Sequence, residues 1–367
     1  SSAYLFSEFY LLAACAALLA APRRPWPLAV GAFWLSFPVA ELPFLALAWS
    51  TATTLAVLLT APAGGAFAVT ALVASALVTA QLAVVIAEAA RTPAIVTRAL
   101  TYAGLPSRAR IRPSWSRAVF APFASRGRRV ERGVSYGPDP AHLLDVYPPA
   151  NGGPGDAVLV YLHGGSYSGG RRSREALPLL RLLARRGWTC VSADYRLRPA
   201  AGLAEHLADA ERVLEWVRRH HAGAPVFLAG SSAGAHLAVL TALRRGGRGF
   251  PVAGVVCLYG FFGRYFGDAA GFGGPTSPLE CDLEGAPPFF IAHGSRDTVV
   301  PVAEARRFAA ALRRESRRPV VLAELTGAQH GFDVFHSARF GAVAEGIAQF
   351  LARLAELRSD RFDDRKV

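Results

Sequence analysis

One serine in this sequence stands where a nucleophile could work. Ser232 is the middle residue of Gly230-Ser231-Ser232-Ala233-Gly234, which fits the pattern G-x-S-x-G. An apolar run comes directly before this motif and a helix-like run directly after it, so the motif predicts a tight strand-to-helix turn. Such a turn exposes the serine hydroxyl, and the helix N-terminus favours developing negative charge. We predict that Ser232 is a nucleophile; the alternative is a chance turn rich in glycine and serine.

A second glycine motif could stabilise the charge that such a nucleophile creates. His163-Gly164-Gly165-Ser166 follows a strand-like apolar run. Two glycines after a strand let backbone N–H groups turn toward a reacting carbonyl, beside the N–H of the residue after the nucleophile. We predict that the N–H groups of Gly165, Ser166 and Ala233 form an oxyanion hole. Gly164 then serves the turn, and His163 is structural. The alternative is a plain glycine-rich loop.

A serine nucleophile needs a general base, and the base needs an acid that orients it. Among the nine histidines, His330 lies in a loop just past the apolar run 320–325. Asp297 lies just past the apolar run 289–292. The chain order Ser232, Asp297, His330, each after a strand-like run, is the order that α/β hydrolases use. We therefore predict that these three residues form a catalytic triad.

Other ionisable side chains fit these roles less well. Asp194 and Asp209 come before Ser232 in the chain, so they fit the order poorly and are expected to be structural. Asp333 lies close to the base and could only tune it. His236 lies one helical turn after Ser232 and is expected to be buried behind the nucleophile.

No pattern in the sequence is typical of a metal, nucleotide or dinucleotide site. The cysteines and histidines lack the spacing of a zinc site, and neither a P-loop nor a dinucleotide glycine fingerprint occurs. A basic segment over 108–132 could suggest nucleic acid, but it follows an apolar stretch and accompanies no nucleic-acid-binding fold. We predict no cofactor, no metal ion and no nucleic acid, with an anionic membrane surface as the partner of the basic segment.

The elements that must position these residues alternate along the second part of the chain. Short apolar runs, expected to be strands, cover 158–162, 189–193, 226–229, 252–258, 289–292 and 320–325. Amphipathic runs, expected to be helices, cover 174–186, 203–220, 235–245, 303–314 and 338–357. Alternating strands and helices predict a mostly parallel sheet with helices on both faces.

Residues 133–350 resemble the α/β-hydrolase superfamily, most closely the hormone-sensitive-lipase-like carboxylesterases and the alkylformamidase-like esterases. The resemblance rests on the motifs above together with Leu144-Asp145-Val146-Tyr147, Ser192-Ala193-Asp194-Tyr195-Arg196, Ser277-Pro278-Leu279, His293-Gly294-Ser295-Arg296-Asp297 and His330-Gly331-Phe332. It implies the α/β-hydrolase fold and an ester substrate. Ser166 departs from many relatives, which have a third glycine there, and most relatives lack the apolar stretches described next.

The first 90 residues differ in composition from the rest of the chain. The 367 residues carry a net charge of +13, but residues 1–90 contribute −1 and the remainder +14. The mean hydropathy of +0.27 is high for a purely soluble protein. Apolar stretches at about 4–21, 28–49 and 66–87 each approach the ~20 residues that cross a bilayer as a helix. We predict three transmembrane helices.

Two residues in these stretches have alternative interpretations. Pro38 and Pro43 flank Glu41, so the second stretch is expected to kink, and it could be shifted or form two short segments. Glu41 faces either a lipid or substrate path or, as we favour, a neighbouring helix or interface, since the other spans offer no partner charge. Cys15 ends a sequence similar to a lipoprotein processing box, but its apolar surroundings favour an ordinary helix cysteine.

Basic residues predict the orientation in the membrane. Arg23 and Arg24 separate the first two stretches, and ten arginines lie within 91–132. Three spans place both basic zones on one side, as the positive-inside rule requires, whereas four spans would separate them. We predict an integral protein of a bacterial plasma membrane with its C-terminal part in the cytoplasm, where cysteines stay as thiols. The rival is a C-terminal part on the export side.

These predictions combine into a transmembrane region at 1–90, a basic juxtamembrane linker at 91–132, an α/β-hydrolase domain at 133–358 and a charged tail at 359–367. The predicted function is a membrane-anchored serine carboxylesterase or lipase that hydrolyses lipid or other apolar esters. An acyltransferase using the same acyl-enzyme is one alternative, and a catalytically silent membrane binding protein is another, against which the complete triad argues. The aromatic segment 259–266 either forms the mouth of the site or packs on the domain. The sequence does not define the oligomeric state.

Overall fold

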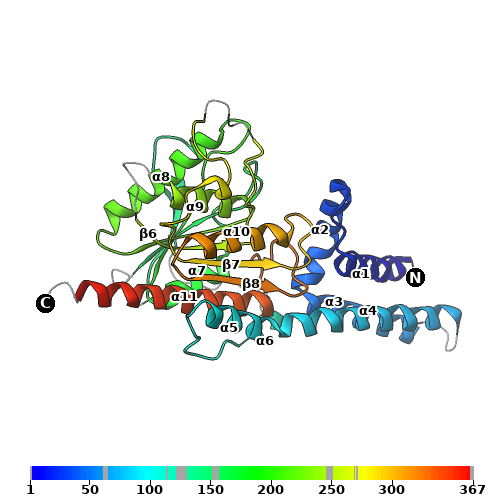
Figure 1. Ribbon diagram of the computed structural model, residues 1–367. Coiled ribbons are helices and arrows are strands. Elements are labelled where there is room, and N and C mark those ends of the chain that lie inside the picture. The colour runs from blue at the N-terminus through cyan, green and yellow to red at the C-terminus, as the bar shows by residue number, and fades with distance from the viewer. Residues whose placement is uncertain are drawn as a thin grey trace.

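The computed structural model describes residues 2–60, 65–112, 115–120, 130–150, 157–244, 251–267, 269 and 272–363. Its strands are β1 (Glu131–Ser135), β2 (Leu143–Tyr147), β3 (Val158–Leu162), β4 (Thr189–Ala193), β5 (Val226–Ser231), β6 (Val252–Leu258), β7 (Phe289–Gly294) and β8 (Val320–Leu325). Within the described residues they form one eight-stranded sheet in the order β1-β2-β4-β3-β5-β6-β7-β8 (Figure 1). Strand β2 is antiparallel to β1 and β4, and the strands from β4 to β8 along the sheet are parallel.

Helices cover both faces of this sheet. They are α7 (Leu177–Arg185), α8 (Leu203–His220), α9 (Ala233–Leu243), α10 (Val302–Glu315) and α11 (Ala338–Asp363). Side chains of α8, α9 and α10 form one apolar core with the sheet, and side chains of α7 and α11 form a second core on the opposite face. The predicted α/β-hydrolase fold with a mostly parallel sheet is therefore confirmed.

The sequence predicts the parallel strands closely but misses the antiparallel edge. All six predicted strands form, and four of them have the predicted bounds. Strands β1 and β2 are not predicted from the sequence, although Leu144–Tyr147 belongs to a motif of the resemblance. Strand β1 is exposed along most of its length, so the burial that makes the other strands apolar is missing there. Helix α11 runs on to Asp363, past the predicted start of the tail at 359.

The N-terminal region forms four helices where three spans are predicted. They are α1 (Ser2–Ala20), α2 (Trp26–Glu41), α3 (Pro43–Thr60) and α4 (Ala66–Ala90). The predicted continuous span over 28–49 is wrong, because the chain leaves the helical conformation at Leu42. Pro43 disfavours helical geometry in the residue before it, and it can start a new helix because it needs no N–H there. The two short segments that the sequence leaves open are what the structure contains.

Two of the described helices are long and apolar enough to cross a membrane. They are Pro43–Thr60 and the run Ala66–Tyr102, which joins α4 to the following helix. The apolar part of α1, Tyr4–Ala20, is shorter. In Figure 1, α1, α3 and most of α4 extend away from one end of the sheet. Helix α2 lies between them and the hydrolase part.

The predicted basic linker contains a helix that packs into the hydrolase core. Helix α5 (Thr92–Tyr102) follows α4 after a single residue and lies beside α11 under the sheet (Figure 1). Val96 and Leu100 are buried there. A Cβ on Gly346 of α11 would lie 2.2 Å from Val96 Cγ1, so the close approach of the two helices requires glycine. A short helix α6 (Trp115–Phe120) follows, and Arg126, Arg128 and Arg129 lie outside the described residues.

Candidate active site

The strand-to-helix turn predicted around Ser232 is present between β5 and α9. Ser232 has φ 50° and ψ −119°, a strained combination for a residue with a side chain. A Cβ on Gly230 would lie 2.3 Å from the Gly234 carbonyl oxygen, and one on Gly234 would lie 2.2 Å from the Leu162 carbonyl oxygen. Both glycines of the motif are therefore needed for the turn to form against β3.

The structure brings the three predicted triad side chains together. Asp297 lies three residues beyond β7 and His330 five residues beyond β8, so both are on the edge of the sheet where Ser232 follows β5. His330 Nε2 lies 3.0 Å from Ser232 Oγ, and His330 Nδ1 lies 2.7 Å from Asp297 Oδ2. Both distances are within hydrogen-bond range. The arrangement can pass a proton from the serine hydroxyl to the imidazole while the carboxylate fixes the ring.

Asp297 is held as an anion inside the protein. Its side chain is fully buried, and its Oδ1 accepts hydrogen bonds from the backbone N–H groups of Val299 (2.9 Å) and Val300 (2.7 Å). Burial alone would raise the pKa of Asp297. The charge of His330 and hydrogen bonds from His293 and His330 lower it by more, so the pKa lies well below its usual value. The carboxylate therefore stays ionised beside the imidazole.

The predicted oxyanion loop follows β3, which pairs with the strand that leads to Ser232. Parallel pairing aligns Leu162 at the end of β3 with Gly230 at the end of β5. The N–H of Gly164 donates to Glu175 Oε2 at 2.6 Å, which ties the start of this loop to Glu175. Gly165 has φ +106°, and its Cβ would lie 2.4 Å from the Gly169 carbonyl oxygen. Gly165 and Ser166 are both exposed, and Ser166 also has a positive φ of 56°.

His163 lies behind this loop and is fully engaged. Its ring is buried and stacks on Tyr195 with 4.5 Å between the ring centroids. His163 Nδ1 lies 2.7 Å from the Gly164 carbonyl oxygen, and the Tyr195 hydroxyl donates to the His163 carbonyl oxygen at 2.8 Å. These contacts fit the structural role that the sequence predicts for this histidine.

The rival acids have other partners. Asp194 accepts hydrogen bonds from the backbone N–H of Arg172 (2.6 Å) and from its side chain. Asp209 is buried and lies 2.8 Å from His142 Nε2, and it also accepts from Arg196. Both acids thus hold neighbouring segments together, which agrees with the structural role expected for them.

The sequence leaves open whether the aromatic segment 259–266 forms the mouth of the site or packs on the domain, and the structure contains some of each. Tyr259, Phe262 and Tyr265 are buried. Phe261 is half-buried, and its N–H donates to the Ser232 carbonyl oxygen at 3.3 Å. Phe266 is 49% exposed. The segment therefore packs on the domain mainly through the three buried rings, and the ring of Phe266 is partly exposed to solvent.

Asp333 and Glu175 belong to a hydrogen-bonded network next to Ser232, and the sequence indicates only the first of these two acids. Asp333 is fully buried and accepts hydrogen bonds from the hydroxyls of Tyr161 (3.1 Å) and Tyr259. The Tyr161 hydroxyl oxygen also lies 2.8 Å from Ser231 Oγ, and Ser231 Oγ donates to Glu175 Oε2 at 2.5 Å. Burial, and then the charge of Glu175, raises the pKa of Asp333 to about 7. No sequence motif signals Glu175, because its partners lie far away in the chain.

A residue from the N-terminal region also reaches the predicted base. The ring of Phe33 in α2 meets the ring of His330 edge to face, with 5.8 Å between the centroids. The sequence places Phe33 within a membrane span and gives no sign of this contact. Helix α2 packs on the loop after β8, where Phe37 also stacks on Phe335 with 5.4 Å between the ring centroids.

Comparisons with known proteins agree with this geometry. A family model described as the alpha/beta hydrolase fold matches residues 159–270, which include the oxyanion loop and the Ser232 motif. Esterase LipC of Mycobacterium tuberculosis is 34% identical over 286 residues, covering 64% of this chain and 68% of LipC. The probable carboxylic ester hydrolase LipM of the same organism is 35% identical over 240 residues, covering 54% of each chain. The chain thus spans about half to two thirds of these relatives.

A solved structure shows the same fold. Esterase 2 of Thermogutta terrifontis, in a form phosphorylated by paraoxon, superposes with a TM-score of 0.51 at 26% identity. The match covers 62% of this chain and 93% of that esterase. The shared part excludes more than a third of this chain, so the N-terminal helices must be understood from their own contacts.

Proposed function

The chain belongs to the α/β-hydrolase family and is a carboxylic ester hydrolase, and we propose that it works through an acyl-enzyme on Ser232. The observation that carries this proposal is the line of contacts from Ser232 Oγ to His330 (3.0 Å) and from His330 to Asp297 (2.7 Å). A serine hydroxyl is a weak nucleophile until a base accepts its proton, and this arrangement supplies the base and its orienting acid.

In the first half of the reaction, Ser232 Oγ attacks the ester carbonyl carbon while His330 Nε2 accepts the hydroxyl proton. The carbonyl oxygen gains negative charge, which the N–H groups of Gly165, Ser166 and Ala233 stabilise. The tetrahedral intermediate then collapses, His330 gives its proton to the leaving alcohol, and the acyl group stays on Ser232. Water, activated by His330, releases the acid by the same steps in reverse.

Covalent labelling tests this mechanism directly. The related Thermogutta esterase is phosphorylated by paraoxon, so an organophosphate or fluorophosphonate is a suitable probe. We expect the full-length protein to be labelled once, and Ser232→Ala to lose both labelling and ester hydrolysis. Ser173→Ala is a matched control, because Ser173 is exposed on a loop before α7. A wild-type protein that stays unlabelled, or a Ser232→Ala variant that still reacts, would exclude the acyl-enzyme.

We further propose that α1, α3 and α4 cross a membrane while α2 stays on the hydrolase side. The supporting contacts lie at the helix ends nearest the sheet. Arg23, after α1, donates to the Ser295 carbonyl oxygen at 3.1 Å, and Glu88, near the end of α4, pairs with Arg296. In this arrangement α1 brings the chain to the hydrolase side, α3 crosses away from it and α4 brings the chain back, with α3 replacing the predicted second span.

The side chains of these helices are distributed as a bilayer would require. Glu8 is buried between helices and accepts a hydrogen bond from Ser50 Oγ at 2.9 Å. Large apolar side chains point outward instead, and they include Phe6, Phe9, Trp49, Leu55, Leu59 and Leu77. An exposed apolar surface of this extent needs an apolar partner, and buried polar pairs are how membrane helices accommodate a carboxyl group.

The proposed sidedness is cytoplasmic for the hydrolase part. Arg23, Arg24, Arg91 and Arg98 all lie at the hydrolase ends of the proposed spans, and the positive-inside rule places such residues in the cytoplasm. A reporter fused after Val367 tests this arrangement. We expect fluorescence from a cytoplasm-only reporter and no alkaline phosphatase activity. The opposite pattern would reverse the topology.

The proposed substrate is a lipid or another apolar ester. The support is the position of α2, a mostly apolar helix of the membrane-anchored region, against His330. The exposed ring of Phe266 adds to it, because this ring packs on Phe261, whose N–H donates to the Ser232 carbonyl oxygen. An acyl chain leaving the bilayer can follow apolar side chains to the site. Hydrolysis rates measured across an acyl-chain series should rise from acetyl to longer chains. A clear preference for acetyl esters would reject this substrate class.

A further inference from the structure

The loops that carry Asp297 and His330 are both held by the N-terminal helices. Loop 295–298 lies between β7 and α10, and loop 326–337 lies between β8 and α11. Side chains and backbone groups of α2 and α4 contact residues on both sides of the acid and residues next to the base.

The strongest of these contacts is an ion pair beside Asp297. Arg296 Nη1 and Nη2 donate to the two carboxylate oxygens of Glu88 at 2.6 and 2.9 Å, a two-point geometry that fixes orientation as well as distance. Glu88 also packs against the second loop. A Cβ on Gly327 would lie 2.1 Å from Glu88 Oε2, so the absence of a side chain there is what admits the carboxylate.

A second connection runs through the side-chain amide of Gln329, which precedes His330. Gln329 Oε1 accepts hydrogen bonds from the backbone N–H groups of Thr298 (2.8 Å) and His330 (3.0 Å). Its Nε2 donates to Ser36 Oγ of α2 at 3.4 Å. Thr298 Oγ1 in turn donates to the Ala29 carbonyl oxygen of α2 at 2.9 Å. One buried amide therefore joins the acid loop, the base and the N-terminal helix.

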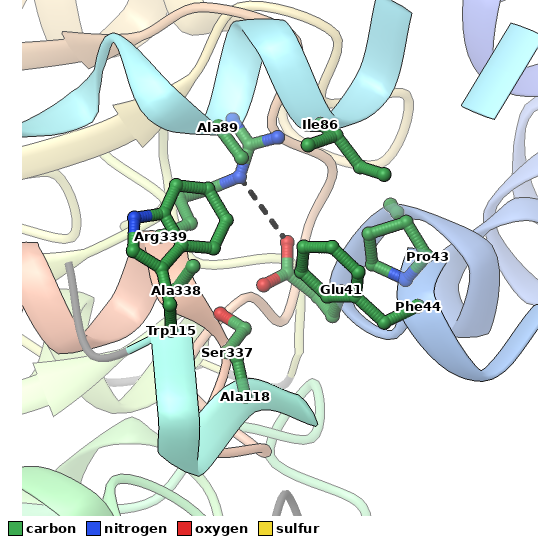
Figure 2. Close-up of a pocket in the computed structure, with 11 residues that line it drawn as sticks. Glu41, Pro43, Phe44, Ile86, Ala89, Trp115, Ala118, Ser337, Ala338 and Arg339 are labelled. Atoms are coloured by element: carbon green, nitrogen blue, oxygen red, sulfur yellow. Dashed lines mark ion pairs between the residues drawn. The ribbon is translucent and has the colours of Figure 1, made fainter. Parts of the chain in front are cut away.

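A third connection lies where α2 ends. Figure 2 shows Glu41 directed toward Arg339, with Ser337, Trp115 and Phe44 around them. Both charged side chains are buried, and Arg339 Nε lies 3.5 Å from Glu41 Oε1. Arg339 Nη1 also donates to the carbonyl oxygen of Thr326, the first residue after β8, at 2.6 Å. Glu41 thus has the charged partner that the other spans lack, and this partner belongs to the hydrolase part.

We propose that α2 and the end of α4 are part of the catalytic centre, because their contacts set the positions of Asp297 and His330. Glu88 and Gln329 are positioning residues in this inference, and Phe33 fixes the ring of His330 from one side. The inference rests on the proposed roles of Asp297 and His330. It adds that the membrane region does more than retain the enzyme: correct packing of its helices is required for proton transfer at Ser232.

Variants at Glu88 test this inference in the full-length protein in detergent. Glu88→Gln keeps one acceptor oxygen for Arg296 and Glu88→Ala keeps none, so the two should form a graded series. We expect kcat to fall about 10-fold and about 100-fold, respectively, with KM changed by less than about 3-fold, because the loss is in alignment and not in substrate binding. The rate of labelling of Ser232 by a fluorophosphonate should fall in the same order.

Glu324→Gln is the matched control. Glu324 makes a similar two-point pair with Arg306 at 2.8 and 2.5 Å, but this pair joins β8 to α10 at the surface, with 57% of the Arg306 side chain and 32% of the Glu324 side chain exposed. Loss of the Glu324–Arg306 pair should leave kcat and the labelling rate within about 2-fold of wild type. Thermal midpoints are measured for every variant, and Glu88→Gln decides the question if Glu88→Ala does not fold.

The outcomes separate this inference from the proposed function. A wild-type protein that is not labelled would overturn the acyl-enzyme itself. The wild type could instead be labelled while the Glu88 variants that fold keep its kcat and labelling rate. That result, even with lower thermal midpoints, would show that the ion pair only stabilises the fold. That result would overturn the positioning role.

Discussion

Glu175 and Ser231 are joined by a hydrogen bond of 2.5 Å, in which the Ser231 hydroxyl donates to Glu175 Oε2. The same carboxylate oxygen accepts the N–H of Gly164 at 2.6 Å. Ser231 immediately precedes Ser232, the proposed nucleophile, and Gly164 immediately precedes the first proposed oxyanion donor. One half-buried carboxylate therefore fixes the spacing between the nucleophile turn and the oxyanion loop.

Glu175→Ala should lower kcat while leaving substrate binding nearly intact. Two hydrogen bonds to a charged acceptor are lost, each worth about 1.5–3 kcal/mol. Only the part of this free energy that holds the loop in place affects the activation barrier. We therefore expect kcat to fall about 10- to 100-fold and KM to change by less than about 3-fold. Steady-state kinetics on a soluble nitrophenyl ester measures both. Glu215→Ala is the control, because Glu215 is exposed on α8. Equal kcat values for the two variants would contradict the role of Glu175.

Gly165→Ala should inactivate the enzyme through the backbone. The residue has φ +106°, and the added Cβ would lie 2.4 Å from the Gly169 carbonyl oxygen, so the loop must move. We expect kcat/KM to fall at least about 100-fold, the usual scale for losing an oxyanion donor. Ser166→Gly tests the neighbouring position, where φ is 56° and glycine fits without strain. It should keep activity within about 3-fold, and a Gly165→Ala variant as active as Ser166→Gly would exclude this loop from catalysis.

Much of this site follows from sequence because its parts are local. The turn at Ser232 needs Gly230 and Gly234 within five residues, and the triad order follows from strands whose apolar runs are distinct. The contacts of Glu175 and Glu88 are different in kind. These contacts join residues separated by tens to hundreds of positions. The spacing of apolar residues does not predict which loop a helix will contact.

The break between α2 and α3 shows a similar limit. Hydropathy reads 28–49 as one apolar stretch, and only Pro43 indicates where it is cut. The proposed support of the active site by α2 depends on three polar groups, because the Ala29 carbonyl, Ser36 and Glu41 have partners in the hydrolase part. In sequence these groups resemble minor interruptions of a membrane span.

Asp297→Asn should leave the fold intact and remove most of the activity. Asparagine has a similar shape, but it is neutral and cannot hold His330 in the same tautomer or stabilise its positive charge. We expect kcat to fall on the order of 10⁴-fold. Asp333→Asn is a useful comparison, because Asp333 is equally buried near the base but contacts Tyr161 and Tyr259 instead. If Asp333→Asn were the more damaging substitution, the acid of the triad would be assigned wrongly.

The stability of the protein should depend on pH through Asp333. Burial, and then the charge of Glu175, raises the pKa of this carboxyl to about 7, so the folded protein holds its proton more tightly than the unfolded chain does. A group of this kind contributes stability that is fully present below the unfolded pKa of about 4 and is lost as pH rises through about 7. The loss amounts to about 1.4 kcal/mol for each pKa unit between the two states.

Asp333→Asn keeps the neutral form at every pH, so its thermal midpoint should change less than that of wild type between pH 5 and 8. Glu175→Gln removes the neighbouring charge and should shift the wild-type decline to lower pH, whereas Glu215→Gln should not. Thermal midpoints measured by intrinsic fluorescence across this range give the result. Parallel curves for wild type and Asp333→Asn would mean that Asp333 is already ionised in the folded enzyme.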